Sequence, residues 1–174
     1  MIARIAREVI FFGVAVALAG CAFVRDSLPV SEPTLEPVTA RPVEPSRGQT
    51  VVALAKRHVG APYRWGGSSP SGFDCSGLVR YVYAQVGVSL PHNAAQQFRL
   101  GTPVTRDSLE PGDLVFFDRL HHSGIYLGEG LFIHARQTGR GVNIASLDDR
   151  WYASHWVGAR RLALPADAGW GQER

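Results

Sequence analysis

The sequence has little of several features that would assign a protein to a class at once. It contains two cysteines, Cys21 and Cys75, which are too few for the disulfide framework of a small secreted domain. Its apolar run from Val9 to Ala19 is well short of a membrane span. It has no block of Lys or Arg, because a formal net charge of +3 is spread thinly along the chain. We therefore expect no nucleic-acid partner.

The chain also lacks the residue spacings that are typical of metal sites. No CxxC or HxxxH pattern is present, although the chain has six histidines besides its two cysteines. Zinc is an alternative to consider, because thiolate and imidazole are both zinc ligands. Without closely spaced ligands we expect no metal and no organic cofactor. We also find no internal repeat, which excludes a solenoid.

The composition suits one globular domain with a tail or linker. An apolar fraction of 45% is enough for an ordinary hydrophobic core. Five prolines lie among Ser, Thr and Glu between Ala22 and Arg47, where no hydrophobic period is found. This composition predicts an extended tether. We place the tether, with Cys21, at residues 21–48, the folded domain at 49–164, and a disordered tail at 165–174.

The first twenty residues have the pattern of a targeting segment. Arg4 and Arg7 precede the short apolar run, as in a secretory signal peptide. The run ends Leu18-Ala19-Gly20-Cys21, which resembles the lipobox of bacterial lipoproteins. That resemblance implies a signal peptide at residues 1–20 and a lipid on Cys21. It also implies a lipid-anchored protein of the outer membrane that faces the periplasm, since Ala rather than Asp follows the cysteine. A plain anchor helix with an incidental cysteine is the alternative.

The rest of the chain predicts helices first and strands afterwards. We expect a helix from Val51 to Val59 with Thr50 as its cap, a second from Cys75 to about Gln85, and a short third between Pro91 and Leu100. Turn residues then separate runs of β-branched and aromatic residues. The expected strands are Asp113–Phe117, His122–Leu127, Leu131–Ala135, Val142–Ala145 and Trp156–Leu162. This order predicts an α+β fold, with N-terminal helices packed on a small antiparallel meander.

Cys75 lies where a loop rich in Gly, Ser and Pro meets the second helix. Asp74 is a good N-cap residue, so Cys75 is expected in the first turn. There the helix dipole and unpaired N–H groups favour a thiolate over a thiol, and the same N–H groups can bind an oxyanion. The alternative is a small buried hydrophobe, which many free cysteines are.

Two histidines are expected side by side on one hairpin. Side chains alternate along a strand, so His122 and Gly124 share a face and His121 has the opposite parity. If the hairpin is centred on Glu129, Gly124 pairs with His134. His122 is then a diagonal neighbour of His134 at about 7–8 Å between Cα atoms. We interpret His121 as a strand-edge residue.

These residues fit the roles of nucleophilic catalysis. A nucleophile needs a base within hydrogen-bond reach, and the base needs a third group that orients it. Cys75, His122 and His134 fill these roles in that order. A Cys–His pair of this kind gives a thiolate–imidazolium couple. Structural histidines, satisfied by buried partners, are the competing interpretation.

The chain is similar to the NlpC-type cell-wall peptidases over residues 50–162. Several ordered motifs carry the resemblance: Gly60–Gly67 (GAPYRWGG), Phe73–Gly77 (FDCSG), Leu90-Pro91 with Gln97 and Gly101, Pro111–Phe117 (PGDLVFF), His122–Gly128 (HSGIYLG), Phe132–Ala135 (FIHA) and Ala159–Arg161 (ARR). The resemblance implies a papain-like fold and a cysteine peptidase. Its expected substrate is the peptide stem of peptidoglycan, cut between D-γ-glutamate and a diamino acid.

Carried over by position, Cys75 resembles the nucleophile, His122 the base and His134 the orienting residue. Tyr63 resembles a tyrosine near the nucleophile. Asp74 and Ser76 resemble residues that line the substrate subsite.

The chain departs from the pattern of that family at two positions near the site. His92 stands where Arg often follows Leu-Pro, and Ser123 replaces a common Val. Neither change removes a catalytic group. We expect a monomeric enzyme of the cell envelope that acts on peptidoglycan. The alternatives are a non-catalytic peptidoglycan-binding or scaffolding lipoprotein and an acyltransferase on the same fold.

Overall fold

The computed structural model describes residues 46–136 and 141–165. All described residues belong to one compact unit, Arg41–Arg174. The predicted signal peptide, the lipidated Cys21, most of the tether and nearly all of the predicted tail lie outside the described residues. No helix among residues 46–136 and 141–165 is long and apolar enough to cross a bilayer.

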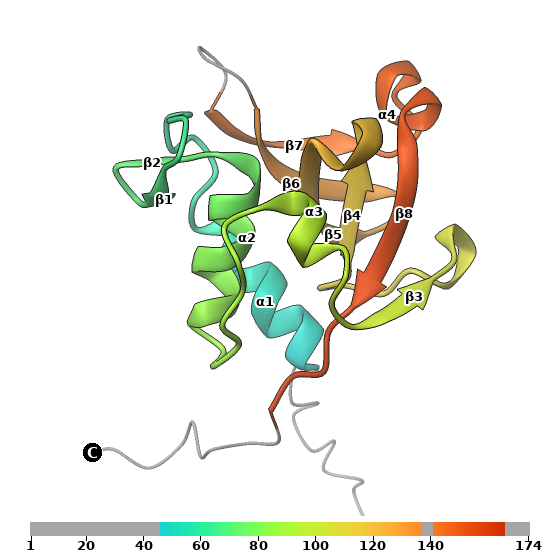
Figure 1. The fold of residues 1–174 in the computed structure, drawn as a ribbon, viewed down its shortest axis with the longest axis horizontal. Coiled ribbons are helices and arrows are strands. Elements are labelled where there is room, and N and C mark those ends of the chain that lie inside the picture. Colours follow the sequence, from blue (N-terminus) through green and yellow to red (C-terminus); the bar gives the residue numbers. More distant parts are fainter. Residues whose placement is uncertain (1–45, 137–140, 166–174) are drawn as a thin grey trace, which may run out of the picture. The chain divides into compact units, whose positions relative to one another are not determined.

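Helices precede most of the strands, as expected (Figure 1). The helices are α1 (Arg47–Lys56), α2 (Cys75–Ala84), α3 (Ala94–Gln97) and α4 (Arg150–Ser154), with 3-10 turns η1 (Arg106–Ser108) and η2 (Asp118–Leu120). The strands are β1 (Ser68–Ser69), β2 (Gly72–Phe73), β3 (Thr102–Val104), β4 (Leu114–Phe117), β5 (His122–Gly128), β6 (Leu131–Arg136), β7 (Gly141–Ser146) and β8 (Trp156–Arg161). The fold is α+β, and its main sheet is antiparallel.

The main sheet has the strand order β3-β8-β4-β5-β6-β7. Strands β4 to β7 form the predicted meander. The prediction is wrong for β8, because this strand returns to pair with β4 rather than continuing beside β7. Helix α4, which lies between β7 and β8 in the chain, was not expected. Strand β3 was not expected either, and it extends the sheet beyond β8.

Helix α1 begins earlier than the apolar pattern suggests. Ser46 caps it, and Gln49 reciprocates by accepting from the Ser46 backbone N–H, which completes a capping box. Thr50, the predicted cap, lies inside the helix. The sequence signal was Ser-x-x-Gln, which lies just upstream of the apolar period.

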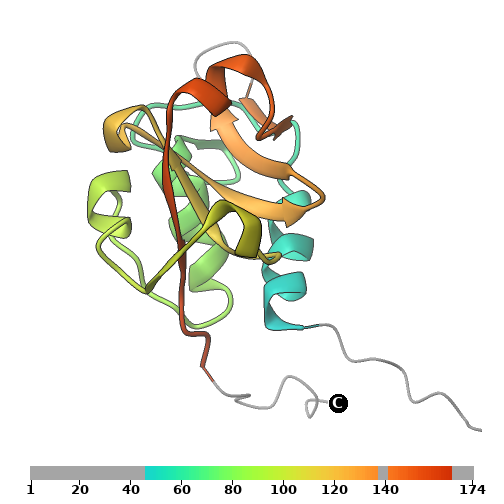
Figure 2. The same ribbon diagram turned by 90° about the vertical axis from the view of Figure 1, so that its right-hand side faces the viewer.

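Two hydrophobic cores lie on opposite faces of the sheet. Helices α1 and α2 cover one face (Figures 1 and 2), where Leu78, Val82, Ile125 and Ile133 are among the buried side chains. The other face carries a smaller cluster: Val115, Phe117, Tyr126, Phe132, Leu147, Tyr152 and Ala159. Strand β4 is buried on both faces, which explains its uninterrupted apolar sequence.

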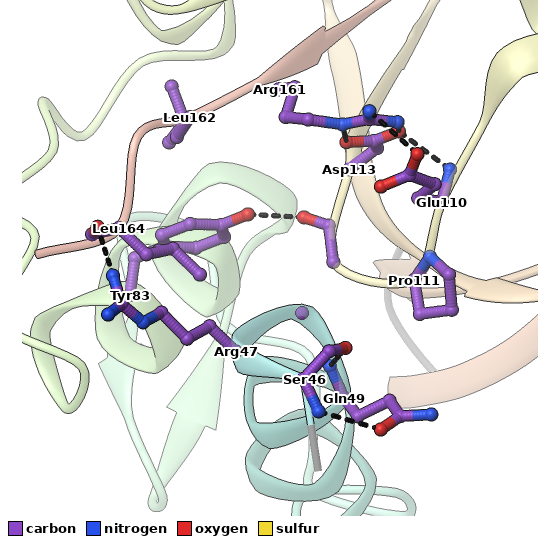
Figure 3. Close-up of a pocket in the computed structure, with 12 residues that line it drawn as sticks. Ser46, Arg47, Gln49, Tyr83, Glu110, Pro111, Asp113, Arg161, Leu162 and Leu164 are labelled. Atoms are coloured by element: carbon purple, nitrogen blue, oxygen red, sulfur yellow. Dashed lines mark hydrogen bonds and ion pairs between the residues drawn. The ribbon is translucent and has the colours of Figure 1, made fainter. Parts of the chain in front are cut away.

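A pocket of about 440 Å³ lies near the end of α2 that is remote from Cys75 (Figure 3). Its wall contains Asp113, which is 2% exposed and accepts two hydrogen bonds of 2.8 Å from Arg161. Tyr83 donates to the Gly112 carbonyl at its floor. Eight residues separate Cys75 from Tyr83, or about 12 Å along the helix axis. These buried polar contacts tie α2 to the start of β4, and the pocket is separate from the histidine pair.

Candidate active site

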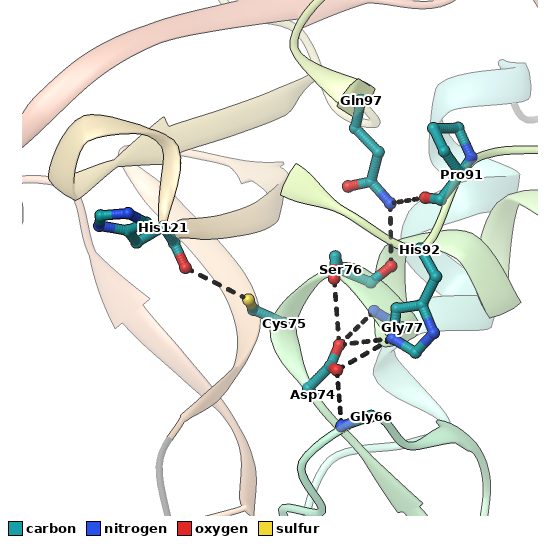
Figure 4. A network of polar contacts seen from close by, with 9 residues as sticks. All are labelled: Gly66, Asp74, Cys75, Ser76, Gly77, Pro91, His92, Gln97 and His121. Carbon is teal, nitrogen blue, oxygen red and sulfur yellow. Dashed lines mark hydrogen bonds and ion pairs between the residues drawn. The ribbon is translucent and has the colours of Figure 1, made fainter. Parts of the chain in front are cut away.

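The loop before α2 delivers Cys75 to the first position of the helix. Asp74 is the N-cap, and its carboxylate accepts from Gly77 N at 2.7 Å, as predicted (Figure 4). The first intrahelical hydrogen bond is donated by Leu78 N to Asp74 O. The amides of Cys75 and Ser76 precede that bond and are therefore available to an anion at the helix start.

Asp74 also holds the surrounding loops together. It is only 9% exposed, and besides Gly77 it accepts from Gly66 N at 2.9 Å and from Ser76 Oγ at 3.1 Å. The His92 Nε2 lies 2.9 Å from both carboxylate oxygens. The side chain that replaces the more usual Arg after Leu-Pro is thus the partner of Asp74. The carboxylate fixes the position of the turn that carries Cys75.

The two predicted histidines meet directly. Ile125 pairs with Ile133, which is the register expected for a hairpin centred on Glu129 at its histidine end. His122 Nε2 and His134 Nδ1 lie 2.7 Å apart in a hydrogen bond. The prediction that both rings share a face is confirmed. A bulge between Tyr126 and Gly128 shifts the register only near the turn.

Tyr152 completes this chain of rings and was not predicted as a site residue. Its hydroxyl lies 3.2 Å from His134 Nε2, so both nitrogens of His134 have partners. His134 is fully buried, and Tyr152 is nearly so. The residue comes from α4, the helix that the sequence pattern did not reveal. The only available signal was an aromatic side chain shortly before the last strand.

The sulfur of Cys75 lies against the backbone on both sides of His122. Its thiol donates to the His121 carbonyl oxygen at 3.8 Å, which Figure 4 shows. The backbone N–H groups of Ser123 and Ser76 lie close enough to this sulfur to favour its thiolate form by lowering the thiol's pKa. His121 therefore contributes its carbonyl, while its ring is largely exposed. The sulfur therefore lies at the start of β5, the strand that carries His122.

Burial sets the protonation of the resting site. It raises the pKa of the Cys75 thiol, and the nearby N–H groups of Ser123 and Ser76 only partly oppose this rise. Burial, with Arg136 nearby, lowers the pKa of His122 to about 4 and, with His122 added, that of His134 to about 2. The expectation of a thiolate favoured at rest was wrong in direction, because desolvation outweighs the helix N-terminus. Thiol and imidazole are neutral until the reaction begins.

The buried histidines predict a loss of stability in mild acid. His122 becomes protonated below about pH 6.5 in the unfolded chain, but only below about pH 4 in the folded protein. The free energy of unfolding should therefore fall as the pH drops through this window, by on the order of 3 kcal/mol for His122 alone. Urea unfolding at stepped pH measures the slope.

A His122→Gln, His134→Asn double variant is the matched control, because it keeps polar groups at both positions without an imidazole. Its curve should be flatter between pH 6.5 and 4. An equal slope in both proteins contradicts the assignment.

The remaining predicted residues divide between the site and the part of the chain outside the described residues. Tyr63 is half-buried, and burial raises the pKa of its phenol, with smaller contributions from the nearby Cys75 and Asp74. Ser76 is buried and donates to Asp74. Cys21 lies outside the described residues. Within the described part of the chain, no group of three or more His, Cys, Asp or Glu is placed to hold a metal ion.

Helices packed on an antiparallel sheet, with a thiol at a helix start beside bonded imidazoles, define a papain-like domain with a Cys–His–His site. The chain belongs to the NlpC/P60 family, whose model matches residues 60–161. It is 44% identical over 127 residues to the murein DD-endopeptidase MepH of Escherichia coli K12, covering 67% of this chain and 47% of that protein. It is 43% identical over 127 residues to the gamma-DL-glutamyl hydrolase of Bacillus subtilis 168, covering 67% of this chain and 30% of that protein.

Solved structures of the family agree with the fold. The NlpC/p60 domain of the peptidoglycan hydrolase SagA matches with a TM-score of 0.61 at 39% identity, over 66% of this chain and 98% of that one. The expected papain-like fold is therefore confirmed. The chain spans about half the length of MepH and less than a third of the glutamyl hydrolase.

Proposed function

We propose that the protein is a lipid-anchored cysteine endopeptidase of the cell envelope that hydrolyses the peptide stems of peptidoglycan. The observation that carries this proposal is the position of the Cys75 sulfur. It lies against the backbone on either side of His122, at a helix start, and His122 is bonded to His134 at 2.7 Å. Membership of the NlpC/P60 family supports the substrate class.

The proposed reaction begins with proton transfer from the thiol. Nε2 of His122 is engaged by His134, so Nδ1 is the nitrogen that accepts the Cys75 proton. In this assignment the Nε2–H of His122 donates a hydrogen bond to His134 Nδ1 throughout, and the Nε2–H of His134 donates one to the Tyr152 oxygen. This assignment gives each buried nitrogen a defined role and keeps the base oriented.

The thiolate then attacks the amide carbonyl, forming a C–S bond while the carbonyl oxygen takes the negative charge. The amides of Cys75 and Ser76 are the proposed donors to this oxyanion. Collapse breaks the C–N bond, and His122 gives its proton to the leaving amine. Water, deprotonated by His122, then hydrolyses the thioester and restores the thiol.

Tyr63, Asp74 and Ser76 are the proposed substrate-binding residues. The β-bridge between Tyr63 and Phe73, two residues before Cys75, supports a place for Tyr63 near the nucleophile. Asp74 and Ser76 flank the nucleophile in the chain, and the hydrogen bond between their side chains fixes the surface next to Cys75. Because Asp74 already accepts hydrogen bonds from Gly66, Gly77 and Ser76, we expect its main contribution to be holding this surface in position for the substrate.

The anchoring part of the proposal rests on the sequence. A lipid on Cys21 would hold the enzyme at the membrane, with residues 21–48 as a tether that reaches the peptidoglycan layer. We infer from Ala22 that the protein is attached to the outer membrane and faces the periplasm. We also infer that it is a monomer.

The bond within the stem is the sharpest part of the proposal. We propose the D-γ-glutamyl–diamino acid bond, in keeping with the name of the Bacillus subtilis glutamyl hydrolase. The name of MepH favours a second candidate, the DD bond of cross-linked stems. The two activities release different products from one substrate mixture.

Digestion of purified muropeptides, followed by mass spectrometry, tests the proposal. Cleavage at γ-glutamate releases fragments that begin with the diamino acid, and it occurs in monomers as well as dimers. DD cleavage instead converts cross-linked dimers to intact monomers. No cleavage of any stem would favour a binding or scaffolding protein. Transfer of the acyl group to an added amine in preference to water would favour an acyltransferase.

A further inference from the structure

The residue after His122 carries a buried hydroxyl that the mechanism above does not use. Ser123 is fully buried in β5. Among the described residues, its Oγ makes no hydrogen bond of ordinary distance and angle. A buried polar group without a partner costs free energy, so such groups are rare in folded proteins and call for an explanation.

The register of the sheet directs Ser123 toward the nucleophile. Ser123 pairs with Phe116, and both lie on the sheet face that α1 and α2 cover. His122 pairs with Phe117 and belongs to the opposite face. The strand therefore presents the Ser123 hydroxyl on the side of α2, where Cys75 begins the helix.

The groups around the sulfur affect the thiol and the thiolate in opposite ways. The thiol donates to the His121 carbonyl, an oxygen that repels a thiolate. The backbone N–H groups of Ser123 and Ser76 favour the thiolate. The Ser123 hydroxyl favours it too, because it also lowers the pKa of the Cys75 thiol. A hydroxyl rotates freely about its C–O bond and can aim its hydrogen at a new acceptor.

We propose that Ser123 is a positioning residue that donates its hydroxyl hydrogen to the Cys75 sulfur when the thiolate forms. The thiol proton goes to His122, and Ser123 keeps its own proton throughout. The hydroxyl is under-bonded in the resting enzyme and satisfied in the reactive state, so its hydrogen bond is made only when charge develops. The inference deepens the proposed function, but its first readout does not depend on peptidase activity.

The pH dependence of Cys75 alkylation by iodoacetamide tests the inference in the full-length chain, with the label located by peptide mapping. In Ser123→Ala the midpoint should rise by about one pH unit, so that about tenfold less thiolate is present below it. Ser123→Thr keeps a hydroxyl on a residue that suits a strand, and it should restore the midpoint. Ser108→Ala, an exposed serine on η1, should change nothing.

Thermal unfolding separates this role from a structural one. Ser123→Ala removes an under-bonded polar group, so its melting temperature should be unchanged or higher. On muropeptides its kcat should fall about tenfold with KM unchanged. An unshifted alkylation midpoint overturns the inference, and so does a shifted midpoint that Ser123→Thr fails to restore. If the midpoint shifts but the wild type cleaves no stem peptide, the inference stands and the proposed function fails.

Discussion

Cys75→Ala should abolish stem-peptide cleavage, with a loss of at least about ten-thousandfold in kcat/KM. The variant retains the helix N-terminus and the bonded histidines, but it has no atom that can attack the carbonyl. Cys75→Ser should be almost as inactive, because a hydroxyl is a much weaker nucleophile than a thiol at this position. Release of new amino groups from purified muropeptides measures the rate.

The two variants also report on the fold. Cys75 is half-buried and makes one weak hydrogen bond through its thiol, so both substitutions should unfold near the wild-type temperature. Inactive but folded protein supports the nucleophile assignment. Cleavage by folded Cys75→Ala at more than a few per cent of the wild-type rate would contradict it.

His122→Ala should lower kcat/KM by roughly a thousandfold or more. Burial raises the pKa of the Cys75 thiol, so without an adjacent base little thiolate forms at neutral pH. The leaving amine also loses its proton donor. Because the wild-type imidazole has a pKa of about 4, wild-type activity should persist well below pH 6, while the variant should gain activity only as the pH rises.

His121→Ala is the matched control for this variant. The two histidines are consecutive, but the His121 ring is exposed and only its backbone carbonyl contacts Cys75. The substitution keeps that carbonyl and should change kcat/KM by less than about threefold, since it touches no reacting group. Equal losses in the two variants would mean that the strand start, not the His122 ring, matters for the rate.

Local signals predicted the parts of the site that depend on one element at a time. Asp74 before an amphipathic period is sufficient to place Cys75 at a helix start, because capping is a short-range interaction. The histidine pair followed from strand alternation and an assumed hairpin centre at Glu129, which the pairing of Ile125 with Ile133 confirms.

Long-range packing decided what the sequence did not reveal. Nothing local distinguishes β8 as a neighbour of β7 from β8 as a neighbour of β4. Helix α4 has five residues, too few for a hydrophobic period, and so Tyr152 was missed as the partner of His134. The raised pKa of Cys75 also depends on burial by segments distant in the chain, whereas the helix N-terminus is visible in the sequence.

Stoichiometric alkylation of Cys75 tests the central claim most directly, because it relates one thiol to the reaction. Peptidase activity is measured while peptide mapping follows the alkylated fraction of Cys75. The account predicts that activity declines in proportion to that fraction and reaches zero when Cys75 is fully modified. Stem peptides still cleaved by fully alkylated, folded protein would show that another group carries out the chemistry.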